Sequence, residues 1–500
     1  MPPMKLDKCT SDKNIQMPWQ IAKFCVWLGF IFGIIGYETG LRLPLILYAF
    51  IAIVQFIILC RQVLLGNYLV SIIGFLQNSI LFIAIIISLK ATHGFGGMLI
   101  SSVYTRPNVA AASSILLASS SLYFLIALKW APGSVWQWAP GDDAELRIAK
   151  YLALSSFIMA MILIPLTSFG PLITLVPYGT SSARAVGGGP LSGSPGLMLL
   201  SGYTLILASV SSIRAWGISS KTVKLIIVVG CMLLFYYYTM RGNRAMTAGV
   251  AIVLLLVYLI MSRRDPWEKL ILYITSCLAI IIWAQVWGYV RSYAASQGLM
   301  RAMIIGWRRG VENSFVKGMH PLRLQMLPGA YWHMLDIVML YHEHVRLHGL
   351  SIMNLVPDMV PKFLEHMMRF HRPLSIPWIL SHYMSNGGGM YVIAEGFWNY
   401  GFWGALGVAA FLALVAVGAE RWIRQQVPLI SGAYFAFILI VPYGMFYALQ
   451  GLARGLETAV ALSWLMAWGV NAAMAGSNRS EKRMQLRHDI NHRMRIKSEI

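Results

Sequence analysis

The chain has 500 residues, of which 58% are hydrophobic and 12% charged, and its formal net charge is +21. Soluble domains carry about 25% charged residues, so this composition excludes a soluble globular protein. The apolar residues form blocks near the ~20 residues that a membrane-spanning helix needs, without the period-two alternation of an outer-membrane barrel. The sequence therefore predicts an all-α polytopic membrane protein.

The predicted organisation begins with a polar tail, residues 1–18, that we expect in the cytoplasm. No small-residue cleavage site follows it, so the first apolar block is interpreted as an uncleaved signal anchor. Nine spans are expected within 19–290, a large outer loop over 291–389, three further spans within 390–475 and a basic cytoplasmic tail over 476–500. The twelve expected spans are 19–37, 43–60, 68–89, 108–128, 151–170, 197–213, 225–240, 245–262, 270–290, 390–419, 428–448 and 458–475.

The distribution of Lys and Arg predicts the orientation of the chain. With the N-terminus in the cytoplasm, the inner links and tails hold 22 Lys and Arg, whereas the short outer links hold 7. This bias is typical of cytoplasmic loops, and it places both termini inside and residues 291–389 outside. An odd number of spans is the alternative, and it would weaken the bias. Because the charges lie in these links, the expected partner is the lipid bilayer rather than a nucleic acid.

Residues 291–389 hold eight of the eleven histidines, ten Lys or Arg and five Asp or Glu. Arg291–Lys317 has the pattern of an amphipathic helix on the membrane surface, and Gly329–Leu347 has a helical pattern. In that second helix, one polar face, shared with two leucines, would carry His333, Asp336, Glu343 and His344. The prolines of Pro357–Met384 predict short helices and turns.

No metal site is predicted. His342-Glu-His-Val-Arg-Leu-His348 is not an HExxH motif, because Arg346 stands at the position of the second histidine. His344 and His348 could share a helical face, but zinc needs a third ligand in a defined geometry. The five cysteines include no CxxC pair, which excludes a thiolate metal site.

Two outer links carry arginines with candidate roles. Arg184 precedes three glycines, a pattern typical of either a phosphate-binding loop or simply a flexible loop. Arg241-Gly-Asn-Arg244 joins two apolar blocks, and its arginines could bind phosphate oxygens bidentately or extend toward lipid head groups.

Glu395 lies within the tenth expected span, about 7 Å from its start at 1.5 Å per residue. A carboxylate inside a span is costly, so Glu395 should face a cavity or a cation; a structural Glu–Arg pair is the alternative. Asn399 follows at i+4 on the same face, and Gly401 and Gly404 allow close packing.

The chain resembles the Wzy-type O-antigen (oligosaccharide repeat unit) polymerases in three features. These are the link Arg241-Gly-Asn-Arg244, the large outer loop and the segment Glu395-Gly-Phe-Trp-Asn-Tyr-Gly-Phe-Trp-Gly404. The resemblance covers the whole topology. It departs at one point, because some members carry an Arg-x10-Gly motif, whereas Gly196 lies one residue beyond that spacing from Arg184.

This resemblance implies a GT-C-like glycosyltransferase of the bacterial inner membrane that joins repeats carried on undecaprenyl pyrophosphate at the periplasmic face. A polysaccharide chain-length regulator is the partner it implies, and no cofactor is expected. The expected pyrophosphate-binding residues are Arg241, Arg244, Arg184 and Arg291, supported by Asn243. The candidate bases are Glu395, Asp336, Glu343, His333 and His344, with Asn399 in support, and Tyr331 and Trp332 could stack on sugars.

Two other functions remain open. A ligase would perform the same chemistry but transfer the glycan to lipid A core. A transporter of polysaccharide or lipid-linked sugar would fit the number of spans, but the two halves of the chain show no matching repeats of the kind that transporters use.

Overall fold

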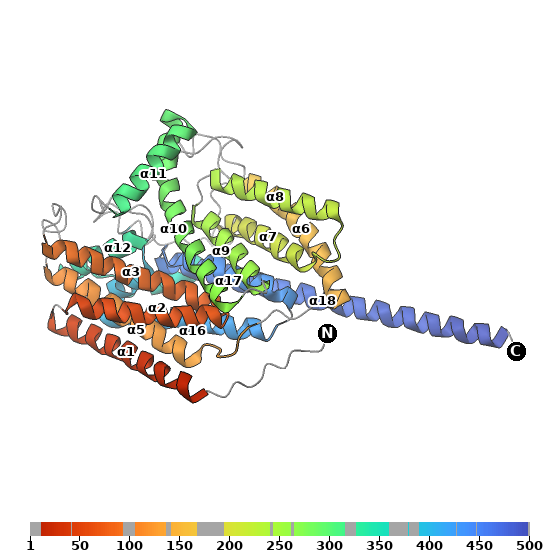
Figure 1. Cartoon of the computed structure of the whole chain (residues 1–500), viewed down its shortest axis with the longest axis horizontal. Coiled ribbons are helices and arrows are strands. Elements are labelled where there is room, and N and C mark those ends of the chain that lie inside the picture. Colours follow the sequence, from red (N-terminus) through yellow and green to blue (C-terminus); the bar gives the residue numbers. More distant parts are fainter. Residues whose placement is uncertain are drawn as a thin grey trace. The chain divides into compact units, whose positions relative to one another are not determined.

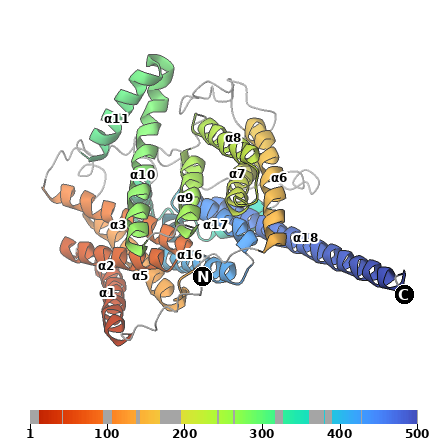
Figure 2. The same cartoon turned by 45° about the vertical axis from the view of Figure 1, so that its right-hand side comes forward.

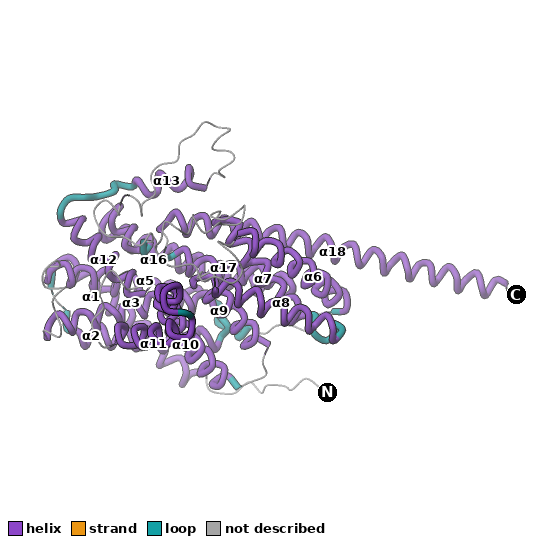
Figure 3. The backbone as a smooth tube through the Cα atoms, turned by 90° about the horizontal axis from the view of Figure 1, so that it is seen from above, coloured by secondary structure: helices purple, strands orange, loops and turns teal. Residues whose placement is uncertain are grey.

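The computed structural model describes residues 12–41, 43–93, 106–136, 142–167, 195–240, 244–261, 265–315, 327–359, 379, 390–426, 428–446 and 448–498. Over these residues the chain is helical and has no strand (Figure 3). Seven of the described helices are long and apolar enough to cross a membrane. The all-α prediction is therefore confirmed. A helix lies at each of the twelve expected ranges, but the count of twelve spans stays a prediction.

The chain divides into two compact units. The first comprises Met1–Trp136, Glu312–Arg421 and Gly444–Ala453, and the second comprises Gln137–Val311, Trp422–Tyr443 and Arg454–Ile500. The segment 291–389, expected as one loop, is thus shared between the units. Of its described helices, α12 packs on α3 and α5.

The first unit contains α1 (Asp12–Thr39), α2 (Leu45–Leu64), α3 (Tyr68–His93), α5 (Arg106–Trp130), α12 (Leu327–His342), α13 (Leu350–Met359), most of α16 (Val392–Arg424) and the start of α18 (Ala448–Ser498). In Figure 1 the four N-terminal helices lie side by side, in red to orange. α1 contacts α2 and α5, and α3 contacts α2 and α5. α12 packs on both α3 and α5.

Glycines bring α1 and α5 together. A Cβ added to Gly29 would lie 2.7 Å from the Ser121 hydroxyl oxygen, and one added to Gly33 would lie 2.7 Å from the backbone nitrogen of Ala118. Gly36 approaches Ser114 in the same way. Small residues at four-residue spacing let two helix backbones approach closely, which is how helices associate in lipid.

The far end of α16 ties three helices of this unit together. Glu420 is fully buried, and its Oε1 accepts hydrogen bonds from the backbone N–H groups of Leu69 at 2.6 Å and Val70 at 3.4 Å. Both N–H groups belong to the first turn of α3, where they lack partners within the helix. Arg421 donates from Nε to the carbonyl of Trp130, the last residue of α5. A buried carboxylate thus caps one helix while the neighbouring guanidinium caps another.

The second unit contains α6 (Asp143–Thr167), α7 (Pro195–Arg214), α8 (Lys221–Met240), α9 (Arg244–Met261), α10 (Pro266–Gln297), α11 (Leu299–Phe315), the short helix η3 (Pro428–Ile430), α17 (Ser431–Gly444) and the rest of α18. α7 contacts α6, α8 and α9. A buried ion pair joins α6 to α7, with Arg214 Nε 3.0 Å from Glu145 Oε1.

α10 and α11 form a helical hairpin (Figure 2). Gly298, with a φ of 77°, stands between them, and Ala302 and Gly306 of α11 pack on Val290 of α10. The opposite side of α11 exposes large apolar residues, among them Ile304 and Trp307, next to exposed arginines. The amphipathic pattern expected for Arg291–Lys317 is therefore present, but α10 continues to Gln297 and only α11 carries it.

Candidate functional site

The motif around Glu395 forms a sharp reversal rather than a straight helix. Two residues inside α16 are not helical: Tyr400 (φ −135°, ψ 22°) and Gly401 (φ 62°, ψ −149°). The conformation of Gly401 is one that only glycine adopts readily. A short buried segment, Val392–Asn399, is thereby separated from the long segment that ends at Arg424.

The two segments of α16 pack against each other through glycines. A Cβ added to Gly404 would lie 2.0 Å from the carbonyl oxygen of Gly396, and one added to Gly396 would meet both Gly404 and Val408. A continuous helix would hold positions 396 and 404 about 12 Å apart at 1.5 Å per residue. The chain therefore folds back at Gly401, and the predicted close packing at Gly404 is confirmed.

Glu395 is 0% exposed and lies in the short segment. Its Oε2 accepts a hydrogen bond of 2.5 Å from the backbone N–H of Leu449, in the first turn of α18. Glu395 therefore caps a helix, as Glu420 does at the other end of α16. A buried carboxylate that accepts from a backbone N–H fits a positioning role, and its predicted role as a base stays a prediction.

Asn399 connects the short segment to α13. Its Oδ1 accepts from the backbone N–H of Ser351 at 3.3 Å, and its Nδ2 donates to the Ser351 hydroxyl at 2.9 Å and to the Glu395 carbonyl at 2.8 Å. Ser351 lies in the first turn of α13, so the asparagine amide satisfies an N–H group that has no partner within the helix. The reversal in α16 thus fixes the start of α13.

α12 buries the aromatic residues that were expected to stack on sugars. Tyr331 is fully buried and shares a hydrogen bond of 3.3 Å with the hydroxyl of Ser113 on α5, and Trp332 is also buried. Neither ring is open to a sugar, and both belong to the packing of α12. Sequence periodicity could not reveal this, because α12 packs on two helices that lie far from it in the sequence.

His333 is largely buried on α12, and burial lowers its pKa to about 4. The ring is therefore neutral near pH 7 and a weak proton acceptor. Asp336 follows on the same helix and is partly exposed.

The helix over Gly329–Leu347 ends earlier than expected. α12 stops at His342, so Glu343 and His344 leave the predicted helical face. His344 and His348 have positive φ values of 63° and 50°, which rules out a shared helical face for the pair. The helix ends where His344 adopts a positive φ, and the apolar spacing of Leu340 and Leu347 conceals this end in the sequence.

This turn exposes several polar side chains, and we call residues 341–348 the basic turn; its part after His342 is the teal loop between α12 and α13 in Figure 3. Glu343, His344, Arg346 and His348 are all exposed. The Arg346 guanidinium lies 4.1 Å from the centroid of the Tyr341 ring, which in turn packs on Phe397 with centroids 4.7 Å apart. Arg346 was not among the predicted site residues, although its place beside three histidines was a usable signal.

The basic turn is held to the helices at both ends. His342 Nδ1 shares a hydrogen bond of 2.9 Å with Asn108 Oδ1 on α5. The indole N–H of Trp398 donates to the carbonyl of Val345 at 2.8 Å, and the backbone N–H of Leu347 donates to the carbonyl of Trp398 at 3.2 Å. The turn is therefore positioned by the short segment of α16, so its exposed side chains have a rigid support.

The expected pyrophosphate ligands lie mostly outside the described residues. Arg184, Arg241 and Asn243 fall there. Arg244 begins α9 and Arg291 lies within α10, but the structure does not describe their side chains. Their role stays a prediction. Among the described residues, no group of three His, Cys, Asp or Glu side chains could hold a metal ion.

No family model, curated protein or solved structure matches this chain.

Proposed function

We propose that this chain is a membrane glycosyltransferase that polymerises oligosaccharide repeat units carried on undecaprenyl pyrophosphate at the periplasmic face of the inner membrane. Its fold would be GT-C-like with twelve spans, and both termini would lie in the cytoplasm. The observation that carries the proposal is the basic turn. It combines a cation, a carboxylate, three histidines and an aromatic ring on a rigid support beside apolar helices.

The chemistry of this reaction needs two kinds of group. The acceptor hydroxyl oxygen attacks the anomeric carbon of the donor sugar, and the bond from that carbon to the diphosphate oxygen breaks. The proton of the hydroxyl passes to a base, and undecaprenyl pyrophosphate leaves as an anion. Guanidinium groups stabilise the leaving anion, and the base must come within hydrogen-bond reach of the hydroxyl.

In the proposal, Arg346 is a cation for the diphosphate, together with the arginines predicted from the sequence. Glu343 and His344 are the candidate bases, because both side chains are exposed beside Arg346. Tyr341 holds the guanidinium by a cation–π contact, which leaves its N–H groups available to phosphate oxygens. Glu395 and Asn399 act as positioning residues that fix the short segment of α16.

The test is extension of a synthetic undecaprenyl-pyrophosphate-linked repeat by the purified chain in detergent, with and without a chelator. The proposal predicts a ladder of glycans that differ by one repeat unit, both with and without the chelator. Transfer only to added lipid A core would indicate a ligase. Absence of any new glycosidic bond, with movement of the lipid-linked repeat across vesicle membranes, would indicate a transporter.

The predicted phosphate arginines allow a second test. Arg241→Ala and Arg244→Ala should each leave single repeats capped onto lipid A core in cells while abolishing longer chains. Chains of wild-type length in both variants would contradict a pyrophosphate-binding role for this link.

A further inference from the structure

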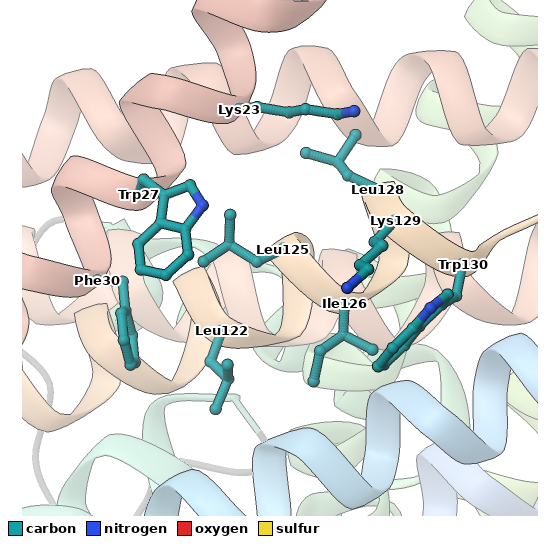
Figure 4. A pocket seen from close by; sticks show the side chains of 9 residues that line it. All are labelled: Lys23, Trp27, Phe30, Leu122, Leu125, Ile126, Leu128, Lys129 and Trp130. Atoms are coloured by element: carbon teal, nitrogen blue, oxygen red, sulfur yellow. The ribbon is translucent and has the colours of Figure 1, made fainter.

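A cavity of about 340 Å³ lies between α1 and α5 in the first unit (Figure 4). Its volume is near the lower end of the ~300–1,000 Å³ that small-molecule sites span, so it holds part of a chain rather than a whole lipid. Lys23, Trp27 and Phe30 line it from α1, and Leu122, Leu125, Ile126, Leu128, Lys129 and Trp130 line it from α5.

The position of the cavity follows from the sequence of α1. Between Gly29 and Gly36 the glycines bring the two helices into backbone contact. Lys23, Trp27 and Phe30 follow one another at i, i+4 and i+7, so they share one face of α1, and that face lies about 100–160° around the helix from Gly29. The cavity therefore lies in a groove beside the glycine contact, where this face of α1 meets the end of α5.

The groove is open to the surroundings of the bundle. Trp27 is 51% exposed and Trp130 is 38% exposed, so the rings border the opening rather than close it. Both α1 and α5 are long and apolar enough to cross a membrane, so in a bilayer this wall would face lipid. An apolar groove facing lipid is a place for an acyl chain.

The rim of the groove is basic. Lys23 and Lys129 are both exposed and extend from opposite helices with leucines between them (Figure 4). The residues that line the cavity include no Asp or Glu. Lys129 Nζ lies 5.1 Å from the ring centroid of Trp130, a contact that leaves its N–H donors free for an anion. Lys residues at the predicted cytoplasmic end of a span attract anionic head groups.

We propose that this groove is a binding site for an anionic glycerophospholipid of the cytoplasmic leaflet. One acyl chain lies along Trp27, Phe30 and the leucines of α5. The phosphate lies between the ammonium groups of Lys23 and Lys129. This site is independent of the proposed glycosyltransferase reaction, and its expected ligand is a structural lipid rather than the donor.

The test is native mass spectrometry of the full-length protein in detergent, titrated with phosphatidylglycerol or phosphatidylcholine. Wild type should bind phosphatidylglycerol more tightly. The Lys23→Gln/Lys129→Gln double variant should lose that preference, with at least about tenfold weaker phosphatidylglycerol binding. Lys224→Gln is the matched control, because Lys224 of α8 also lies near an indole, 5.0 Å from the Trp216 ring, but does not line this cavity. This variant should bind both lipids as wild type does.

A second variant tests the apolar part. Leu125→Phe fills the groove and keeps both lysines, so it should weaken binding of the phospholipid while leaving thermal stability near that of wild type. Equal affinity of wild type for the two lipids, wild-type affinity in the double lysine variant, or preference for undecaprenyl pyrophosphate over phosphatidylglycerol would each overturn the proposal.

Discussion

Several residues with predicted catalytic or supporting roles fall into two regions that differ in their exposure. Glu395, Asn399, Tyr331 and Trp332 are buried and bonded within the packing of α12, α13, α16 and α18. Glu343 and His344 are exposed on the basic turn, beside Arg346. The structure therefore separates the predicted residues by burial: the first region packs and bonds within the helices, and the second exposes its polar side chains.

The largest expected effect belongs to the exposed region. Glu343→Gln removes a candidate base, so the rate of glycan extension should fall by about 10²–10⁴-fold if Glu343 is the base. The variant should melt at the same temperature as wild type, because the side chain is exposed. His344→Gln run in parallel decides between the two bases. Wild-type rates in both variants would remove the basic turn from the reaction.

The support should respond most to a change at its glycine contact. Gly404→Ala places a methyl group against the backbone of Gly396, so unfolding should become easier by about 1–3 kcal/mol or more. Gly407→Ala is the control on the same helix, since nothing lies within 4 Å of its added Cβ. That change should be neutral or slightly stabilising because alanine favours helix. Equal melting temperatures for the two variants would contradict the reversal at Gly401.

The buried region should also make stability depend on pH. The pKa of His333 is about 4 in the folded chain and 6.5 in an unfolded one. Between these values the unfolded state binds more protons, so stability is full above pH 6.5 and falls by up to about 1.4 kcal/mol per unit as pH drops toward 4. His333→Asn should flatten this part of the profile relative to wild type. An unchanged slope in the variant would show that other groups cause it.

Much of the fold could be predicted from the sequence, because apolar blocks of membrane length are a strong signal. The reversal in α16 was not predicted, because the positive φ of Gly401 and its contact with Tyr341, 60 residues earlier in the chain, are features of the tertiary structure. The expectation that Glu395 faces a cavity or a cation stays a prediction. The hydrogen bond that its Oε2 accepts from Leu449, at the start of α18, could not be derived without the tertiary contact.

The smallest effect is expected for the two capping carboxylates. Glu395→Gln and Glu420→Gln keep an oxygen that accepts the backbone hydrogen bond. Each variant loses only the negative charge at a helix N-terminus, so each should lower the free energy of unfolding by less than about 1 kcal/mol. The two variants are matched, because each carboxylate is fully buried and caps a helix in the same unit. A much larger loss of stability for Glu395 alone would reveal a further ionic partner.

The most direct measurement is the single-turnover rate of glycan extension by purified Arg346→Ala and Glu395→Gln, compared with wild type on the same lipid-linked repeat. If the basic turn carries the chemistry and Glu395 is a cap, Arg346→Ala loses at least about a hundredfold in rate while Glu395→Gln stays within a few fold of wild type. The opposite pattern, with extension retained by Arg346→Ala and abolished in a folded Glu395→Gln, would contradict the account.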